Sequence, residues 1–227
     1  MRPVIRAGCA LLAAILLSGG CARIPPAALA PSAADALWAA RQEQLNNLRQ
    51  WNLRGRVAIR TSESGASAHL RWERKDQQSR IDLFGAFGGG KARLWVDENG
   101  ARLRDHQGQE FEADSATQVL ADGTGWHIPL DQLGYWIRGL PAPSEVRAIE
   151  TDARGALISL SQLGWDITYS EYAVFDEKEL PRKIRMMAWP DTVKNFSTHA
   201  GLIGDTLIVK ILIEHWSERA TVKEMEQ

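Results

Sequence analysis

The sequence predicts a mainly β fold, an antiparallel meander of about ten strands and two helices that curves strongly but closes incompletely around an apolar interior. Three observations predict it. Apolar and polar residues alternate over most of the chain, with glycines or an Asn-Gly pair between the alternating segments. Two segments have helical spacing instead. Tryptophan is abundant, with 9 residues against 3 Tyr and 5 Phe, which suits a wide apolar concavity.

The amino terminus has the features of a secretory signal. Two arginines precede an apolar run, residues 7–17, that is too short to span a bilayer. The small residues before Cys21 resemble the lipobox of bacterial lipoproteins, although Ser18 stands where that motif usually has leucine. This resemblance implies that residues 1–20 are a signal peptide and that Cys21 becomes the lipid-carrying first residue of the mature chain. A plain signal peptide that is cleaved elsewhere is the alternative interpretation.

Composition bounds the rest of the chain. The formal net charge is −1, so no nucleic-acid partner is expected. Once residues 1–20 are removed, Cys21 is the only cysteine, and no internal disulfide is possible. Residues 21–31 are rich in proline and alanine and are interpreted as a lipid-anchored linker. The globular domain is expected over residues 32–216, and a charged tail over residues 217–227.

The domain is expected to begin with an amphipathic helix. Trp38, Leu45, Leu48 and Trp51 fall on one helical stripe, which would pack on a sheet. From Trp51 onward the period changes to two, which predicts a first strand as far as Ile59 and an antiparallel partner after it.

A hairpin with a glycine-rich loop follows. Apolar residues alternate at positions 81–83 before the loop and at positions 92–96 after it. The loop Gly85-Ala-Phe-Gly-Gly-Gly90 carries Phe87 with few side chains to pack against it. Although the loop partly matches a phosphate-binding motif, the required Ser or Thr is absent, and the next residues alternate like a strand instead of opening a helix. An incidental exposed phenylalanine is the alternative interpretation of this loop.

The second half contains a helical segment and then strands. Asp114 or Ser115 is expected to cap a short helix, and Pro129 to stand in the first turn of another helix that ends near Gly139. The run from Leu207 to Trp216 is apolar on both faces, which predicts a strand that is covered on both sides or closes the sheet. The strands expected before it are residues 146–151, 157–162 and 165–171 and a segment around residues 184–188.

The motifs of catalysis and metal binding are not found in the sequence. The five histidines are far apart and form no H-x-x-x-H or H-x-H pair, and no G-x-S-x-G elbow occurs. We therefore expect no enzyme activity, no metal and no cofactor.

Five segments together resemble the LolB family of outer-membrane lipoproteins, in the order and spacing of that family. The resemblance implies an incomplete antiparallel barrel of about eleven strands, with helices that cover an apolar cavity. The segments are Trp51-Asn-Leu-Arg-Gly-Arg-Val57, the loop within Arg80–Gly88, Ala113-Asp-Ser115, Ile128–Leu133 with Trp136-Ile-Arg-Gly-Leu-Pro141, and Trp165 with Tyr169 and Tyr172.

The resemblance also implies a function. The family accepts lipoproteins from the periplasmic carrier LolA, holds their acyl chains in the cavity and delivers them into the outer membrane, where it is itself anchored. The partners implied are LolA, acylated lipoprotein cargo and outer-membrane phospholipid, and a monomer is expected. The family's hairpin loop commonly reads Asn-Pro-Leu-Gly, and its exposed leucine falls on Phe87 here, between Gly85 and Gly88. A lipid-anchored periplasmic protein that binds a small hydrophobic ligand is the alternative function.

The candidates for the acyl-binding cavity share inward-facing positions on the expected strands and helices. They are Trp51, Val57, Ile59, Leu70, Trp72, Ile81, Leu83, Leu94, Val96, Leu133, Trp136, Ile137, Trp165, Ile167, Tyr169, Ile184 and Met186.

Overall fold

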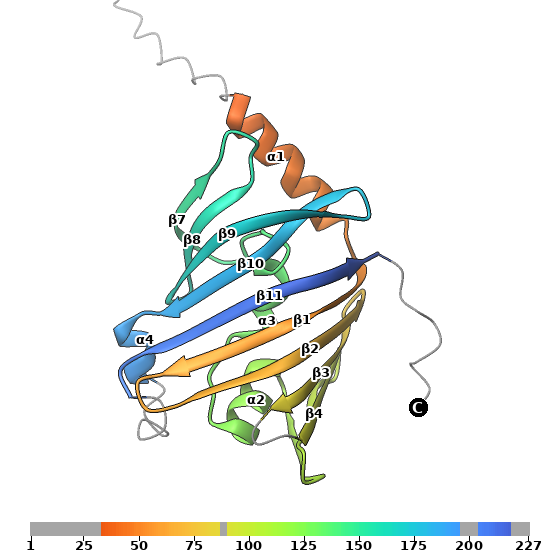
Figure 1. Cartoon of the computed structure of the whole chain (residues 1–227), viewed down its shortest axis with the longest axis vertical. Helices are drawn as coiled ribbons and strands as arrows, with labels where there is room; N and C mark the ends of the chain where they lie inside the picture. Colours follow the sequence, from red (N-terminus) through yellow and green to blue (C-terminus); the bar gives the residue numbers. More distant parts are fainter. Residues whose placement is uncertain (1–32, 87–89, 196–203, 219–227) are drawn as a thin grey trace, which may run out of the picture. The chain divides into compact units, whose positions relative to one another are not determined.

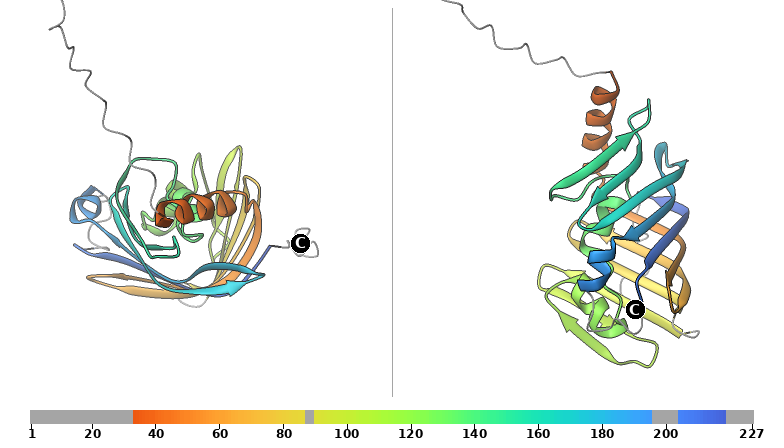
Figure 2. Two further views of the ribbon diagram at one scale, coloured as in Figure 1. Left: turned by 90° about the horizontal axis from the view of Figure 1, so that it is seen from above. Right: turned by 90° about the vertical axis from the view of Figure 1, so that its left-hand side faces the viewer.

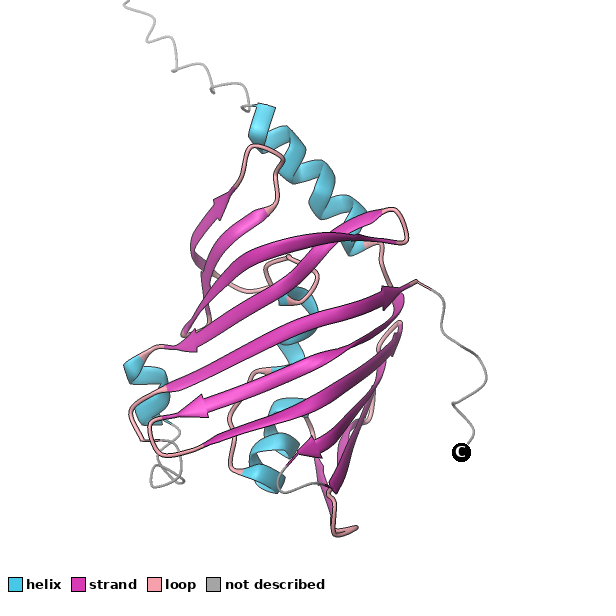
Figure 3. Cartoon of the chain, in the orientation of Figure 1, coloured by secondary structure: helices cyan, strands magenta, loops and turns pink. Residues whose placement is uncertain are grey.

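The computed structural model describes residues 33–86, 90–195 and 204–218. Residues 32–227 form one compact unit, and residues 1–31 form another. In chain order the elements are α1 Ala33–Asn46, β1 Gln50–Thr61, β2 Gly65–Lys75, β3 Gln78–Ala86, β4 Gly90–Asp97, β5 Gly100–Arg104, β6 Glu110–Ala113, α2 Ala116–Thr124, α3 Leu130–Trp136, β7 Val146–Thr151, β8 Leu157–Gln162, β9 Trp165–Phe175, β10 Lys178–Ala188, α4 Pro190–Asn195 and β11 Leu207–Ser217 (Figures 1 and 3).

The strands form one antiparallel sheet of 11 strands in the order β6-β5-β4-β3-β2-β1-β11-β10-β9-β8-β7. The first and last strands of the chain pair in the middle of the sheet, and β6 and β7 are its two edges. The sheet curves around α1, α2 and α3, which lie on its concave side (Figure 2). The incomplete antiparallel barrel that the sequence predicts is thus confirmed.

The strand β11 is apolar on both faces in the sequence, which predicted a strand that is covered on both sides or closes the sheet. Leu207, Val209, Ile211 and Ile213 are buried on the concave side, while Leu212 is half-buried on the convex side. The pairing with β1 shifts between Arg54 and Gly55, where β11 contains one extra residue. This bulge returns Trp216 to the concave side. The strand is therefore central in the sheet, with an apolar inner face throughout.

The helices differ from the expectation at three points. The helix α1 ends at Asn46, so Leu48 lies in the connection to the sheet and Trp51 lies within β1, although both are buried. The change to a period of two at Trp51 outweighs the helical stripe because β1 pairs on both sides. The helix α3 ends at Trp136, before Gly139. The helix α4 was not predicted at all.

The short helices on the concave side are fixed by polar side chains. Ser115 caps α2, and its hydroxyl accepts a hydrogen bond from the Gln118 amide at 3.1 Å. Asp131 of α3 accepts hydrogen bonds from the amides of Ala116 and Thr117, each at 3.1 Å, which fastens the start of α3 to the start of α2. The Ser115 cap agrees with one of the two predicted from the sequence.

Two buried polar side chains hold α3 against the rest of the core. Arg138 donates to the carbonyl oxygens of Gly134, Leu45 and Leu48 at 2.9, 2.9 and 3.1 Å, which links α3 to the end of α1. Burial, and secondly the charge of Arg74, lower the pKa of Arg138 to about 10, so the guanidinium remains a cation at neutral pH. Gln162 accepts from the Trp136 indole at 2.9 Å.

Candidate functional site

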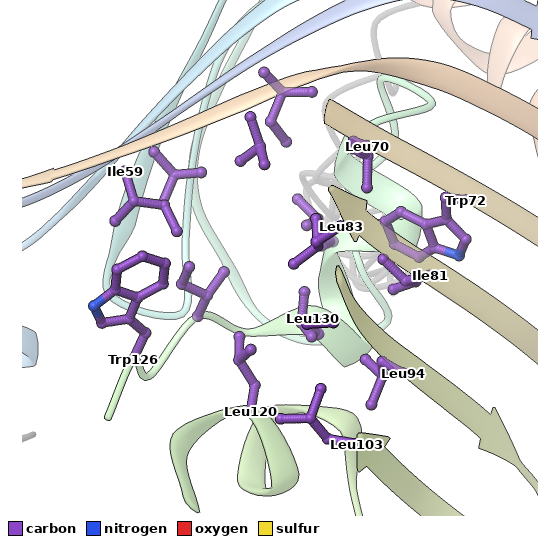
Figure 4. Close-up of a pocket in the computed structure, with 16 residues that line it drawn as sticks. Ile59, Leu70, Trp72, Ile81, Leu83, Leu94, Leu103, Leu120, Trp126 and Leu130 are labelled. Atoms are coloured by element: carbon purple, nitrogen blue, oxygen red, sulfur yellow. The ribbon is translucent and has the colours of Figure 1, made fainter. Parts of the chain in front are cut away.

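An apolar cavity of about 70 Å³ lies between the concave face of the sheet and the segment that joins α2 to α3 (Figure 4). Every described residue that lines it is apolar, so none of them would hold a charged or hydrogen-bonding ligand. The lining residues are Val57, Ile59, Leu70, Trp72, Ile81, Leu83, Ala92, Leu94, Leu103, Leu120, Trp126, Ile128, Leu130, Leu133, Val209 and Ile211.

Trp126 stands at the boundary of this cavity. Its side chain is half-buried and also lines a second cavity of about 20 Å³, which shares Val57, Ile59 and Leu83 with the first. Trp126 belongs to the segment 125–129, which begins at the left-handed Gly125 (φ 76°) and ends at Pro129. The indole therefore fills space between two apolar voids, and it is carried by a segment without helical structure.

The cavity is small for an acyl chain. An engineered apolar cavity of about 150 Å³ holds one benzene molecule. The cavity here has about half that volume, so the interior must expand before it takes up a longer alkyl chain. The helices α2 and α3 are joined by the hydrogen bonds of Asp131. The segment 125–129 between them lines the cavity through Trp126 and Ile128.

The structure divides the predicted cavity residues into two groups. Eight of them line the cavity: Val57, Ile59, Leu70, Trp72, Ile81, Leu83, Leu94 and Leu133. The other nine do not line it. Eight of these are buried in the packed core, namely Trp51, Trp136, Ile137, Trp165, Ile167, Tyr169, Ile184 and Met186, and Val96 is half-buried against that core.

Eight cavity residues were not predicted. Ala92, Leu103, Val209 and Ile211 lie on strands, and the alternation that selected their neighbours would have selected them too. The remaining four, Leu120, Trp126, Ile128 and Leu130, come from α2, α3 and the segment between them. Leu130 lies on the same apolar helical stripe as the predicted Leu133, and that stripe would have selected it. No sequence signal distinguishes the other three, because they face the cavity only through the way the two short helices pack on the sheet.

The predicted membrane loop is described only at its base. Gly85 has φ 77°, a conformation that favours glycine, and a Cβ atom added there would meet nothing within 4 Å. Phe87 and Gly88 lie outside the described residues. Beside Gly85, the ring of Phe84 is 37% exposed and lies under the Lys91 ammonium at 5.2 Å.

Three tryptophans form a cluster beside the cavity. The rings of Trp51 and Trp216 stack with centroids 4.8 Å apart, and the rings of Trp51 and Trp72 meet edge-on at 5.3 Å. Within the part of the chain that the structure describes, these three indole N–H groups are buried and have no hydrogen-bond acceptor. Trp72 alone of the three lines the cavity, and Trp51 packs against it from the core.

Over residues 33–86, 90–195 and 204–218, no group of three or more His, Cys, Asp or Glu side chains is placed to hold a metal ion. In the same ranges, no helix has the length and apolar character needed to cross a membrane.

A half-open β shell around a cavity with an apolar lining defines a protein that shields apolar groups from water. The family model described as "Outer membrane lipoprotein LolB" matches residues 49–216 of this chain. The chain therefore belongs to the LolB family, whose members are lipid-anchored receptors for lipoprotein localisation at the outer membrane, with the LolA carrier and lipoprotein cargo as partners.

Three relatives, each named outer-membrane lipoprotein LolB, show how far the similarity extends. The Chromohalobacter salexigens protein is 36% identical over 66% of this chain and 69% of its own length. The Pseudomonas aeruginosa protein is 30% identical over 91% of this chain and 93% of its own, and the Pseudomonas putida protein is 31% identical over 80% and 81%. Among solved structures, a DUF1329 family protein from Desulfovibrio piger has a TM-score of 0.48 at 9% identity, covering 85% of this chain and 95% of its own.

Proposed function

We propose that this protein is anchored by lipid on Cys21, accepts acylated lipoproteins from LolA, holds their acyl chains in the apolar cavity and passes them to outer-membrane phospholipid. The observation that supports this proposal is the cavity whose lining residues are all apolar. Residues 1–20 act as the signal peptide, residues 21–31 as a tether, and the domain works as a monomer without catalysis.

The proposed transfer needs no chemical energy. Each methylene group that leaves water contributes about 0.8 kcal/mol, so ten buried methylenes give about 8 kcal/mol. Part of that is spent on moving the segment 125–129 aside, because the cavity as it stands has room for only a small apolar group. A bilayer shields the whole acyl chain without this cost, and transfer toward the membrane is therefore downhill.

In this proposal, delivery depends on the loop between β3 and β4. Phe87 stands at the position of the family's exposed leucine and would enter the membrane surface. The described base of the loop supports this role, because Gly85 is exposed with open space around it and Phe84 beside it is also exposed. A bulky apolar group at such a tip gains free energy only by leaving water.

Mass spectrometry of the bound cargo tests the proposal against the alternative function. The domain from residue 32 onward lacks Cys21 and stays in the periplasm when it is secreted there. We expect acylated proteins to co-purify with it. Free lipid without any acylated protein would contradict the proposal and favour a carrier of small hydrophobic ligands.

Replacing Trp126 by alanine tests whether the segment 125–129 limits access to the cavity, a role that we call the gate. The substitution joins the cavities of about 70 and 20 Å³, so an apolar fluorescent probe is expected to bind at least about tenfold more tightly, while the free energy of unfolding falls by about 2 kcal/mol. Trp189→Ala is the matched control, since Trp189 is also half-buried but packs under Arg147 away from the cavity. Equal probe affinity in the two variants would rule out the gate.

A further inference from the structure

A row of basic and apolar side chains crosses the convex face of the sheet. Cross-strand pairing places Phe84 opposite Lys91 and His69, His69 opposite Arg56, Arg56 opposite Leu212, and Leu212 opposite Lys183. The alternation of the strands turns these residues away from the cavity, and Leu212 is half-buried among exposed neighbours. The row runs from β4 across to β10. The helices α1, α2 and α3 lie on the other, concave side of the sheet (Figure 2).

Next to this row, two cations face each other without a counter-ion. Arg185 of β10 is the cross-strand partner of Lys210 of β11, and both are exposed. Within the described residues neither side chain forms an ion pair, whereas Arg56 pairs with Glu214 at 2.5 Å and Lys183 pairs with Glu171 at 2.5 Å. Like charges directly opposite one another destabilise a sheet.

These cations surround a hollow in the convex face. A groove of about 610 Å³ has a lining that combines basic, hydroxyl and apolar residues, and Val57 and Ile211 of this lining also line the cavity on the other side of the sheet. The lining residues are Arg56, Lys183, Arg185, Lys210, Ser67, Ser170, Leu212, Val57, Ala58, Ile184 and Ile211. We call this groove, with its four basic side chains Arg56, Lys183, Arg185 and Lys210, the basic groove. Glu214 and Glu171 neutralise Arg56 and Lys183, so the unbalanced positive charge of the groove comes from Arg185 and Lys210.

The basic groove is open to solvent, which fits the headgroups of a lipid surface better than an enclosed ligand. Lysine and arginine side chains attract anionic lipid, each contributing affinity at low ionic strength. A half-buried leucine in the same groove suits contact with the upper part of a bilayer. Because the family is anchored in the outer membrane, a phospholipid surface lies within reach of the domain at all times.

We propose that the basic groove docks the domain onto anionic phospholipid headgroups. The docking surface is on the opposite side of the sheet from the cavity, and it includes none of the loop residues 87–89. It would set how the domain lies on the membrane, independently of how cargo is held.

The test uses residues 32–227, which form one compact unit and do not contain Cys21. Binding is measured by sedimentation with vesicles of phosphatidylcholine alone and with vesicles that also contain phosphatidylglycerol. We expect binding only to the anionic vesicles, weakened by salt. The double variant Arg185→Gln/Lys210→Gln is expected to bind them about thirtyfold more weakly, since it removes two cations.

The matched control is Arg49→Gln/Lys194→Gln, which also removes two exposed cations but outside the basic groove. It should bind as the parent does. Because removing Arg185 and Lys210 relieves a like-charge pair, the groove variant should be at least as stable as the parent in a thermal melt. Three results would each overturn the docking surface: no binding to anionic vesicles, equal loss in both double variants, or unchanged binding in the groove variant.

Discussion

Replacing Phe87 by glutamate is expected to abolish delivery of lipoproteins to the membrane while cargo binding stays intact. A carboxylate at the tip of the β3–β4 loop would have to lose its water shell at the bilayer surface, and burying a charge without a partner costs several kcal/mol. The described residues that line the cavity are unchanged in this variant, so we expect the acyl chains to be held as before. The measurement is transfer of a labelled lipoprotein from loaded protein to outer-membrane vesicles, with co-purification of cargo as the binding readout.

Val174→Glu is the matched control for this loop. Val174 is 72% exposed on β9, so the substitution adds the same charge at another exposed apolar position. Delivery by this variant should equal that of the parent. Normal delivery by Phe87→Glu would show that the loop does not enter the membrane. Loss of cargo binding in this variant would show that the loop acts in cargo binding and not in delivery.

Replacing Arg138 by alanine is expected to lower the free energy of unfolding by about 4 kcal/mol. The guanidinium is 5% exposed and donates to the carbonyl oxygens of Leu45, Leu48 and Gly134. Each buried acceptor that loses its donor costs about 1–3 kcal/mol, and the link between α1 and α3 is lost as well. Urea denaturation measures the loss, and the midpoint of a thermal melt should fall by about 10 °C.

Arg154→Ala provides the comparison for an arginine at the surface. Arg154 pairs with Asp152 at 2.9 Å and with Glu179 at 2.7 Å, but its side chain is largely exposed. Its loss should lower the stability far less than the loss of Arg138 does, because solvent screens exposed ion pairs. If both variants lose the same stability, the buried hydrogen bonds of Arg138 do not hold α3 in place.

The strands were predictable to different degrees. The hairpin of β3 and β4 followed from alternation on both sides of a glycine-rich loop, and both strands are present. The end of α1 was not predictable, because Leu48 and Trp51 continue a helical stripe that pairing in the sheet overrides. Similarly, β11 runs through Ser217, one residue beyond the expected boundary of the domain.

The candidate site was predicted only in part, for a related reason. Alternation shows which side of a strand a residue faces, so Ile81 and Leu94 were correctly placed on the concave side. Trp165 and Met186 face the same side but lie in packed core. The difference depends on what lies opposite each position, and the pattern within one strand contains no information on that.

The sequence by itself determined the class of fold, the place of most strands along the chain and the apolar character of the concave face, because a period of two and well-spaced glycines act within a few residues of one another. It did not determine that β11 pairs with β1 in the middle of the sheet. Only the tertiary structure decided the size of the cavity, the place of Trp126 beside it and the meeting of Arg185 with Lys210. These depend on register and on packing between segments far apart in the chain, where a single bulge in β11 changes which side chains face inward.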